Sequence, residues 1–157
     1  MDRQFFILTL VAALSALLVI AAFTDIKSRI ISNRLNITVA ALAPLFWIAT
    51  GLPLWPGMFI QIVLATIIFI SFALMFALGF MGGGDVKLLG ALALWLPLQP
   101  MMTLLLVMSI LGGAVTAVTV LHHKIGRHTG RPEIPYGVAI ALAGLWVVGE
   151  RYFNHFA

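Results

Sequence analysis

Two aspartates differ from the other acidic residues of this chain because each lies at the end of a long apolar segment. Asp25 follows the apolar stretch 5–23. Asp85 follows the stretch 58–80 and comes directly after Gly82-Gly83-Gly84. An ionisable side chain beside a segment that lies in a membrane is costly, so a functional role is its default interpretation.

Two carboxyl groups that meet in a cavity cannot both ionise easily, so the pair shares one proton. The ionised member can take a proton from water, and the protonated member can hydrogen-bond a carbonyl group and later protonate a leaving amine. Such a pair hydrolyses a peptide bond without a serine, a cysteine or a metal. The glycine run favours a cavity, since it offers backbone freedom at positive φ and lets an extended peptide approach the main chain.

Each aspartate also has a purely structural interpretation. Asp25 could cap a helix or pair with Lys27 and Arg29, and Asp85 could be the N-cap of the helix that follows it. The pair favours function over these alternatives because both residues lie on one side of the membrane in the topology inferred below. Whether the two side chains meet stays open at this point.

The composition excludes an ordinary soluble domain. The chain has 157 residues, of which 62% are hydrophobic and only 9% are charged, whereas soluble domains carry about 25% charged residues. There is no cysteine, which excludes disulfides and thiolate chemistry. The net charge of +4 could suggest nucleic acid in a soluble protein, but here we interpret the basic residues as determinants of membrane topology and expect no nucleic-acid partner.

Six apolar segments predict an all-α bundle of about six transmembrane helices in a single domain covering residues 1–157. They are residues 5–23, 35–50, 58–80, 86–96, 101–121 and 137–153. The fourth is short and is followed by Pro97 and Pro100, so it either crosses with a kink or turns back.

The basic residues favour six crossings. If every segment crosses, one side of the membrane carries seven basic residues and the other carries only Arg3 and Arg151. This asymmetry is typical of a cytoplasmic side with both termini on the opposite side. The seven are Lys27, Arg29, Arg34, Lys87, Lys124, Arg127 and Arg131.

Three sequence blocks resemble the type IV prepilin peptidases, a family of GxGD intramembrane aspartyl proteases. The segment 82–92, GGGDVKLLGAL, resembles the family's GxGD-V-K-L signature. The segment 25–33, DIKSRIISN, resembles its first-aspartate block, and 134–141, IPYGVAIA, resembles a third block at the start of the last helix. The GxGD pattern alone is weak, but the three blocks in this order on six apolar segments are specific.

The resemblance implies that Asp25 and Asp85 are the catalytic pair, that Gly82 and Gly84 shape the motif loop, and that Lys87 is a motif residue of open role. It implies a membrane aspartic endopeptidase that removes the short basic leader of prepilins or pseudopilins at the cytoplasmic face of the bacterial inner membrane. No cofactor and no metal are expected, and the pilus assembly machinery is a conceivable partner. The block residues that could support the site are Lys27, Arg29, Asn33, Pro135, Tyr136 and Gly137.

Two departures from the family pattern matter. Ser32 stands where the family has a proline. The larger members carry an N-terminal segment with cysteine pairs and also N-methylate their product, whereas this chain resembles the short, peptidase-only form found with tight-adherence (Flp-type) pili. We therefore expect no methyltransferase activity. The motifs are also shared by an archaeal sibling that processes archaellin-like substrates.

Two other function classes stay open. A proton-coupled transporter also combines glycine-broken helices with buried aspartates, although its site would lie near the midplane. A non-catalytic assembly subunit would use the glycines for packing alone. A metal site at His122, His123 and His128 is conceivable, but a solvated basic loop is the plainer interpretation.

Overall fold

The structure, a computed structural model, describes residues 2–125 and 136–153, with the side chains of 122–125 and 153 left out, and these residues are mostly helical. The described part contains six α-helices, a short π-helical turn and no strand, so the predicted fold class is confirmed. The elements are α1 (Arg3–Ser28), α2 (Asn33–Thr50), η1 (Leu54–Met58), α3 (Phe59–Ala77), α4 (Gly83–Ala93), α5 (Leu98–Ile125) and α6 (Tyr136–Phe153).

Large apolar side chains cover much of the surface, which indicates that lipid surrounds the bundle. On α3 alone, Phe59, Ile67 and Leu74 are each more than half exposed. Soluble monomers rarely expose contiguous apolar patches of this extent. Three helical segments, Arg3–Ser28, Leu54–Ala77 and Leu98–Leu121, are long and apolar enough to cross a membrane. The protein is therefore a membrane protein.

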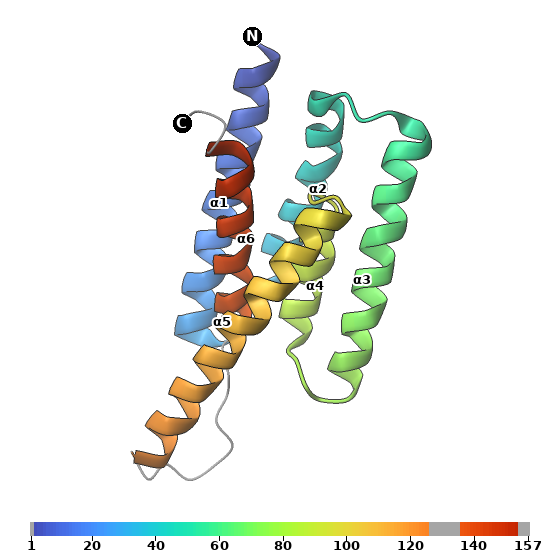
Figure 1. The fold of residues 1–157 in the computed structure, drawn as a ribbon. Coiled ribbons are helices and arrows are strands. Elements are labelled where there is room, and N and C mark those ends of the chain that lie inside the picture. The colour runs from blue at the N-terminus through green and yellow to red at the C-terminus, as the bar shows by residue number, and fades with distance from the viewer. Residues whose placement is uncertain (1, 126–135, 154–157) are drawn as a thin grey trace.

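The helices place the two aspartates at the same end of the bundle (Figure 1). Helices α1 and α6 lie side by side, α4 lies between α2 and α3, and α5 crosses the bundle obliquely. The α1–α2 and α3–α4 connections lie at the lower end of the view, whereas the described chain ends lie at the upper end. Asp25 near the end of α1 and Asp85 near the start of α4 thus share the lower end.

Helix α1 is longer than predicted and includes Asp25. The first apolar segment ends at residue 23, but the helix continues to Ser28 and ends where Arg29 adopts a left-handed conformation with φ 55°. The Arg29 N–H donates to the Asp25 carbonyl oxygen at 3.0 Å. The helical backbone continues into polar residues, because it does not require apolar side chains. This extra turn fixes the direction of the Asp25 side chain.

Helix α4 is too short to cross a membrane alone, because its eleven residues span about 16 Å. It ends within the height of the bundle and turns into α5 (Figure 1). The break between α4 and α5 leaves carbonyl oxygens without a helical N–H partner, and side chains donate to them instead. Gln61 Nε2 donates to the carbonyl oxygens of Ala93 (2.6 Å) and Leu96 (2.7 Å), and Trp47 Nε1 donates to that of Leu94 (2.7 Å). Buried protein contacts thus replace the missing helical hydrogen bonds.

The glycine run does not use the freedom at positive φ that glycine offers. The glycines with positive φ among the described residues are Gly51 and Gly79, which lie outside the run. Gly82 is extended with φ −74° and is the N-cap of α4, while Gly83 and Gly84 are its first helical residues. The alternative in which Asp85 is the N-cap of this helix is therefore wrong. The glycines serve close approach instead of unusual dihedral angles.

Candidate active site

The Asp25 carboxyl group lies against the first turn of α6. Its side chain is only 4% exposed. The Val138 N–H donates to Asp25 Oδ2 at 3.0 Å, and the Gly137 amide also faces the carboxyl group. The first amides of a helix have no partner within the helix and favour negative charge. The last turn of α1 and the first turn of α6 therefore hold Asp25 from two sides.

The Asp85 carboxyl group folds back over the first turn of its own helix. Asp85 is the third helical residue of α4 and is 8% exposed. The Gly82 amide faces the carboxyl group, which is the geometry of an acidic residue at the third position of a helix. A Cβ atom at Gly82 would lie 3.0 Å from Asp85 Oδ2. A glycine at this position therefore leaves one side of the carboxyl group uncovered.

Ile31 connects the first turns of α4 and α6. A Cβ atom at Gly84 would lie 3.1 Å from the Ile31 carbonyl oxygen and 3.2 Å from its Cβ. A Cβ atom at Gly137 would lie 2.6 Å from Ile31 Cδ1 and 2.8 Å from both Cγ and Oδ2 of Asp25. Both helices approach this residue closely only because the second residue of each is a glycine. The three sequence blocks that are separated along the chain thus meet around one side chain.

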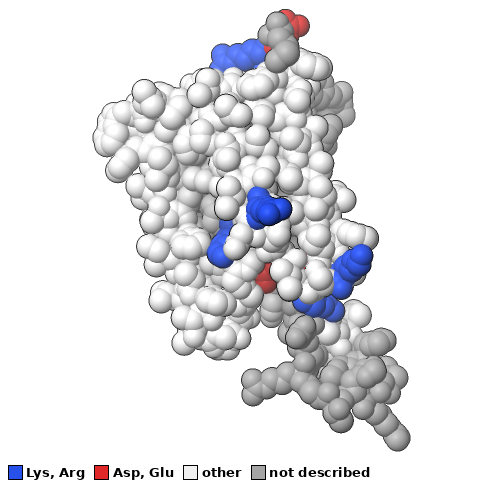
Figure 2. Space-filling view, turned by 180° about the vertical axis from the view of Figure 1, so that it is seen from behind, with Lys and Arg blue, Asp and Glu red and all other residues white. Residues whose placement is uncertain are grey.

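The two carboxyl groups are close enough to interact electrostatically, and they lie among basic groups at one end of the molecule. Figure 2 shows a small acidic surface in the lower half of the view, with basic groups around it. Asp25 and Asp85 are the described acidic residues at that end. The small size of this acidic surface agrees with the slight exposure of the two side chains, 4% for Asp25 and 8% for Asp85.

A second set of polar contacts joins α2 to α4 beside this site. Lys87 Nζ donates to Asn33 Oδ1 at 2.8 Å, so the motif lysine binds the first helical residue of α2. Asn36 Nδ2 donates to the Gly84 carbonyl oxygen at 3.0 Å. These bonds hold the glycine-rich turn of α4 against α2.

The remaining predicted site residues lie around the centre or outside the described part. Lys27 and Arg29 are exposed at the end of α1, and the charge of Arg29 acts on Asp25. Tyr136 is half-buried against α5, where a Cβ atom at Gly112 would lie 3.5 Å from its ring. Pro135 lies outside the described residues, as do the side chains of the histidine-containing loop considered for a metal site.

Two positioning residues were missed in the sequence. Ile31 looked like one apolar residue among many. Asn36 lies inside the second apolar segment and is only 5% exposed. A polar side chain within an apolar segment is itself a signal of function, and this one could have been found on that ground.

A comparison with known families covers two of the three sequence blocks. The family model of the type IV leader peptidase family matches residues 12–117. This range contains both aspartates, the glycine run and Asn36, and it leaves out the first turn of α6. No curated protein and no solved structure matches the chain significantly.

Proposed function

Because this chain belongs to the type IV leader peptidase family, we propose that it is an aspartic endopeptidase in which Asp25 and Asp85 share one proton. The observation that supports this most directly is that the helix starts beside the two aspartates, at Gly84 and Gly137, both lie against Ile31 at one end of the bundle, where the two carboxyl groups interact electrostatically.

The surroundings of the two carboxyl groups suggest different roles. The Val138 amide donates to Asp25, and the first turn of α6 stabilises negative charge there. Asp25 is therefore the ionised member, which takes a proton from the attacking water. Asp85 carries the shared proton, hydrogen-bonds the scissile carbonyl group and then protonates the leaving amine. Water attack forms the new C–O bond, and protonation of nitrogen breaks the C–N bond.

The substrates in this proposal are type IV prepilins or pseudopilins, cut after their short basic leader at the cytoplasmic face of a bacterial inner membrane. The basic residues Lys27, Arg29 and Arg34 are exposed at the end of the bundle that carries the aspartates, which fits a cytoplasmic side. Within this proposal the enzyme has no methyltransferase activity and requires no cofactor or metal. Contact with the pilus assembly machinery is part of the same proposal.

A proton-coupled transporter has less support. Its aspartates would lie near the middle of the bundle, whereas these lie near one end. Membership of a peptidase family adds to that argument.

The decisive experiment compares the purified protein in detergent with Asp25→Asn and Asp85→Asn, using a candidate prepilin from the same genome and mass detection of the products. The wild type is expected to cut once after the leader. Each variant is expected to lose at least about 10²-fold in kcat, because either substitution removes an ionisable group that transfers a proton.

Asp2→Asn is the matched control, since Asp2 is exposed at the opposite end of the bundle. It should cut at the wild-type rate. A variant at position 25 or 85 that is folded and still cuts at the wild-type rate would reject the proposed pair.

A further inference from the structure

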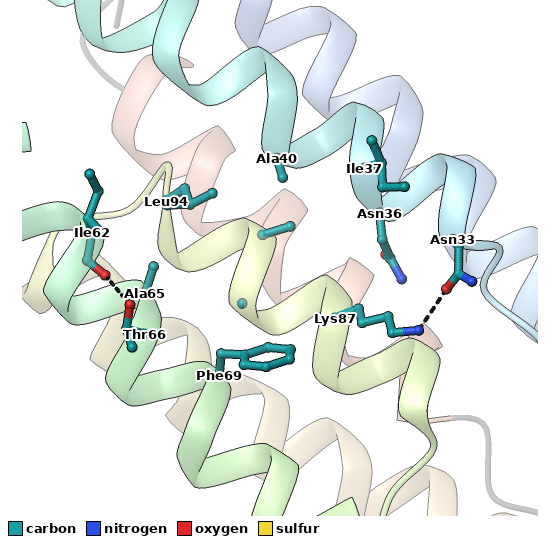
Figure 3. Close-up of a pocket in the computed structure, with 12 residues that line it drawn as sticks. Asn33, Asn36, Ile37, Ala40, Ile62, Ala65, Thr66, Phe69, Lys87 and Leu94 are labelled. Carbon is teal, nitrogen blue, oxygen red and sulfur yellow. Dashed lines mark hydrogen bonds between the residues drawn. The ribbon is translucent and has the colours of Figure 1, made fainter.

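A groove with a cavity volume of about 580 Å³ lies between α2, α3 and α4, outside the carboxylate site (Figure 3). Its walls are apolar over most of their length and include Ile37 and Ala40 from α2, Ala65 and Phe69 from α3, and Gly90 and Ala91 from α4. It follows α4 from Lys87 to Leu94, a length of about 10 Å. Nothing in the chemistry derived above uses this cavity.

The polar groups of the cavity gather at the end nearest the glycine-rich turn. Asn33, Asn36 and Lys87 line this end. The Lys87 ammonium group binds Asn33, as the dashed line in Figure 3 shows. The only other polar side chain in the lining, Thr66, donates to the Ile62 carbonyl oxygen of its own helix. The cavity is thus apolar along its walls and polar where it meets the first turn of α4.

Asn36 carries a buried acceptor without a partner. Its Nδ2 must face the Gly84 carbonyl oxygen, because that oxygen can only accept. This orientation fixes the position of Oδ1, which is buried and has no hydrogen-bond partner within the described part of the chain. A buried polar atom without a partner costs about 1–3 kcal/mol. Because Oδ1 is closed to solvent in this structure, a donor reaches it only when the polar end of the groove opens. A ligand that supplies an N–H group there would remove this cost.

We propose that this groove binds the apolar segment that follows the cleavage point of the substrate, with Asn36 Oδ1 accepting a backbone N–H from its first residues. The proposal rests on the proposed function. A lipid chain fills an apolar groove equally well, but it has no N–H to offer Asn36. The first four N–H groups of a helix are free to donate, so the start of an apolar helix supplies both properties that the groove presents.

The path from this groove to the carboxyl groups passes the first turn of α4. Residues 85 and 87 point about 200° apart around the helix, so Asp85 and the groove lie on opposite faces of α4. An extended chain of three residues covers about 10 Å. Gly82 is exposed at this turn and Gly83 is half-buried, so no side chain at these positions blocks the crossing. Because Gly82 and Gly83 have no side chains, the substrate can cross this turn, and Asp85 stays uncovered on one side.

The test of the groove uses two substrates and two variants in which a larger side chain fills the groove. The first substrate is a full-length prepilin, and the second is a peptide with the leader and only six residues after the cut. Ala40→Phe and Thr66→Phe fill the groove from two different helices. For the full-length substrate, each is expected to raise KM at least about tenfold, because apolar contacts are lost. Cleavage of the short peptide should not change.

Ile67→Phe is the matched control, since Ile67 is exposed on α3 but does not line the groove. It should cut both substrates as the wild type does. Unchanged KM in both groove variants, with thermal unfolding in detergent equal to the wild type, would overturn the docking while leaving the peptidase intact. A wild type that cuts neither substrate overturns the proposed function and the docking with it.

The role of Asn36 is tested by removing one N–H from the substrate at a time. Esters replace the first four amide bonds after the cut in separate peptides, which are given to the wild type and to Asn36→Leu. One ester should lower kcat/KM of the wild type about tenfold relative to the all-amide peptide. The same ester should leave kcat/KM of Asn36→Leu unchanged. If every ester costs both enzymes equally, Asn36 only holds Gly84 and does not bind substrate.

Discussion

At the scale of single residues, the main chain at Gly137 comes so close to Asp25 that no side chain fits between them. The methyl group of Gly137→Ala would overlap the Asp25 carboxyl group and Ile31. We expect this variant to lose about 10²-fold in kcat, because a displacement of about 1 Å at a reacting group has that effect. Cleavage kinetics and thermal unfolding in detergent measure the two consequences separately.

Gly149→Ala, on the same helix, is the control for this variant, because a Cβ atom there meets no atom within 4 Å. It removes the flexibility of a helical glycine without touching the site, and it should keep wild-type activity. Equal activity in both variants would show that the contact between α6 and Asp25 does not matter for cleavage.

The shared proton predicts the pH dependence of the same site. At low pH both Asp25 and Asp85 are protonated and no base remains, whereas at high pH both are ionised and no acid remains. The profile of kcat/KM against pH should therefore be bell-shaped, with two apparent pKa values that belong to the pair. A profile that rises to a plateau and stays there would contradict the shared proton.

At the scale of elements, the sequence predicted the helices well and their ends poorly. The apolar segments identified all six α-helices, since long apolar segments are a strong signal of helices in a membrane. The extra turn of α1 could not be predicted from hydrophobicity because its residues, among them Lys27 and Ser28, are polar. The meeting of α4 and α6 at Ile31 is a tertiary contact, and only the glycines at positions 84 and 137 hint at it.

The break between α4 and α5 depends on one buried side chain of α3. Gln61 is 6% exposed and donates to two carbonyl oxygens that have left the helical pattern. Gln61→Leu keeps the approximate volume but leaves both oxygens unsatisfied. We expect it to lower the free energy of unfolding by about 1–3 kcal/mol, measured by denaturation in detergent.

Thr66→Val is a suitable comparison for Gln61→Leu on the same helix. The Thr66 hydroxyl is exposed and bonds only the Ile62 carbonyl oxygen of its own helix. Its loss should change stability by less than about 0.5 kcal/mol. If both variants were equally stable, groups other than Gln61, such as Trp47, would be sufficient to stabilise the break between α4 and α5.

At the scale of the whole molecule, the distribution of charge gives the two ends of the bundle different characters. The described basic side chains Lys27, Arg29, Arg34 and Lys87 belong to the end that carries the carboxyl groups, and Arg3 and Arg151 belong to the other. The positive-inside rule then predicts a cytoplasmic active site. The sequence indicated this orientation before the fold was known, because the count of basic residues needs only the order of the spans.

Single cysteines test this orientation in whole cells, since the chain has none of its own. Ser28→Cys places a thiol at the exposed end of α1, and Leu54→Cys places one in the exposed α2–α3 connection at the opposite end. A membrane-impermeant maleimide should label position 54 in intact cells and position 28 only after permeabilisation. The reverse pattern would put the carboxyl groups outside the cytoplasm, where a leader that has not crossed the membrane cannot reach them.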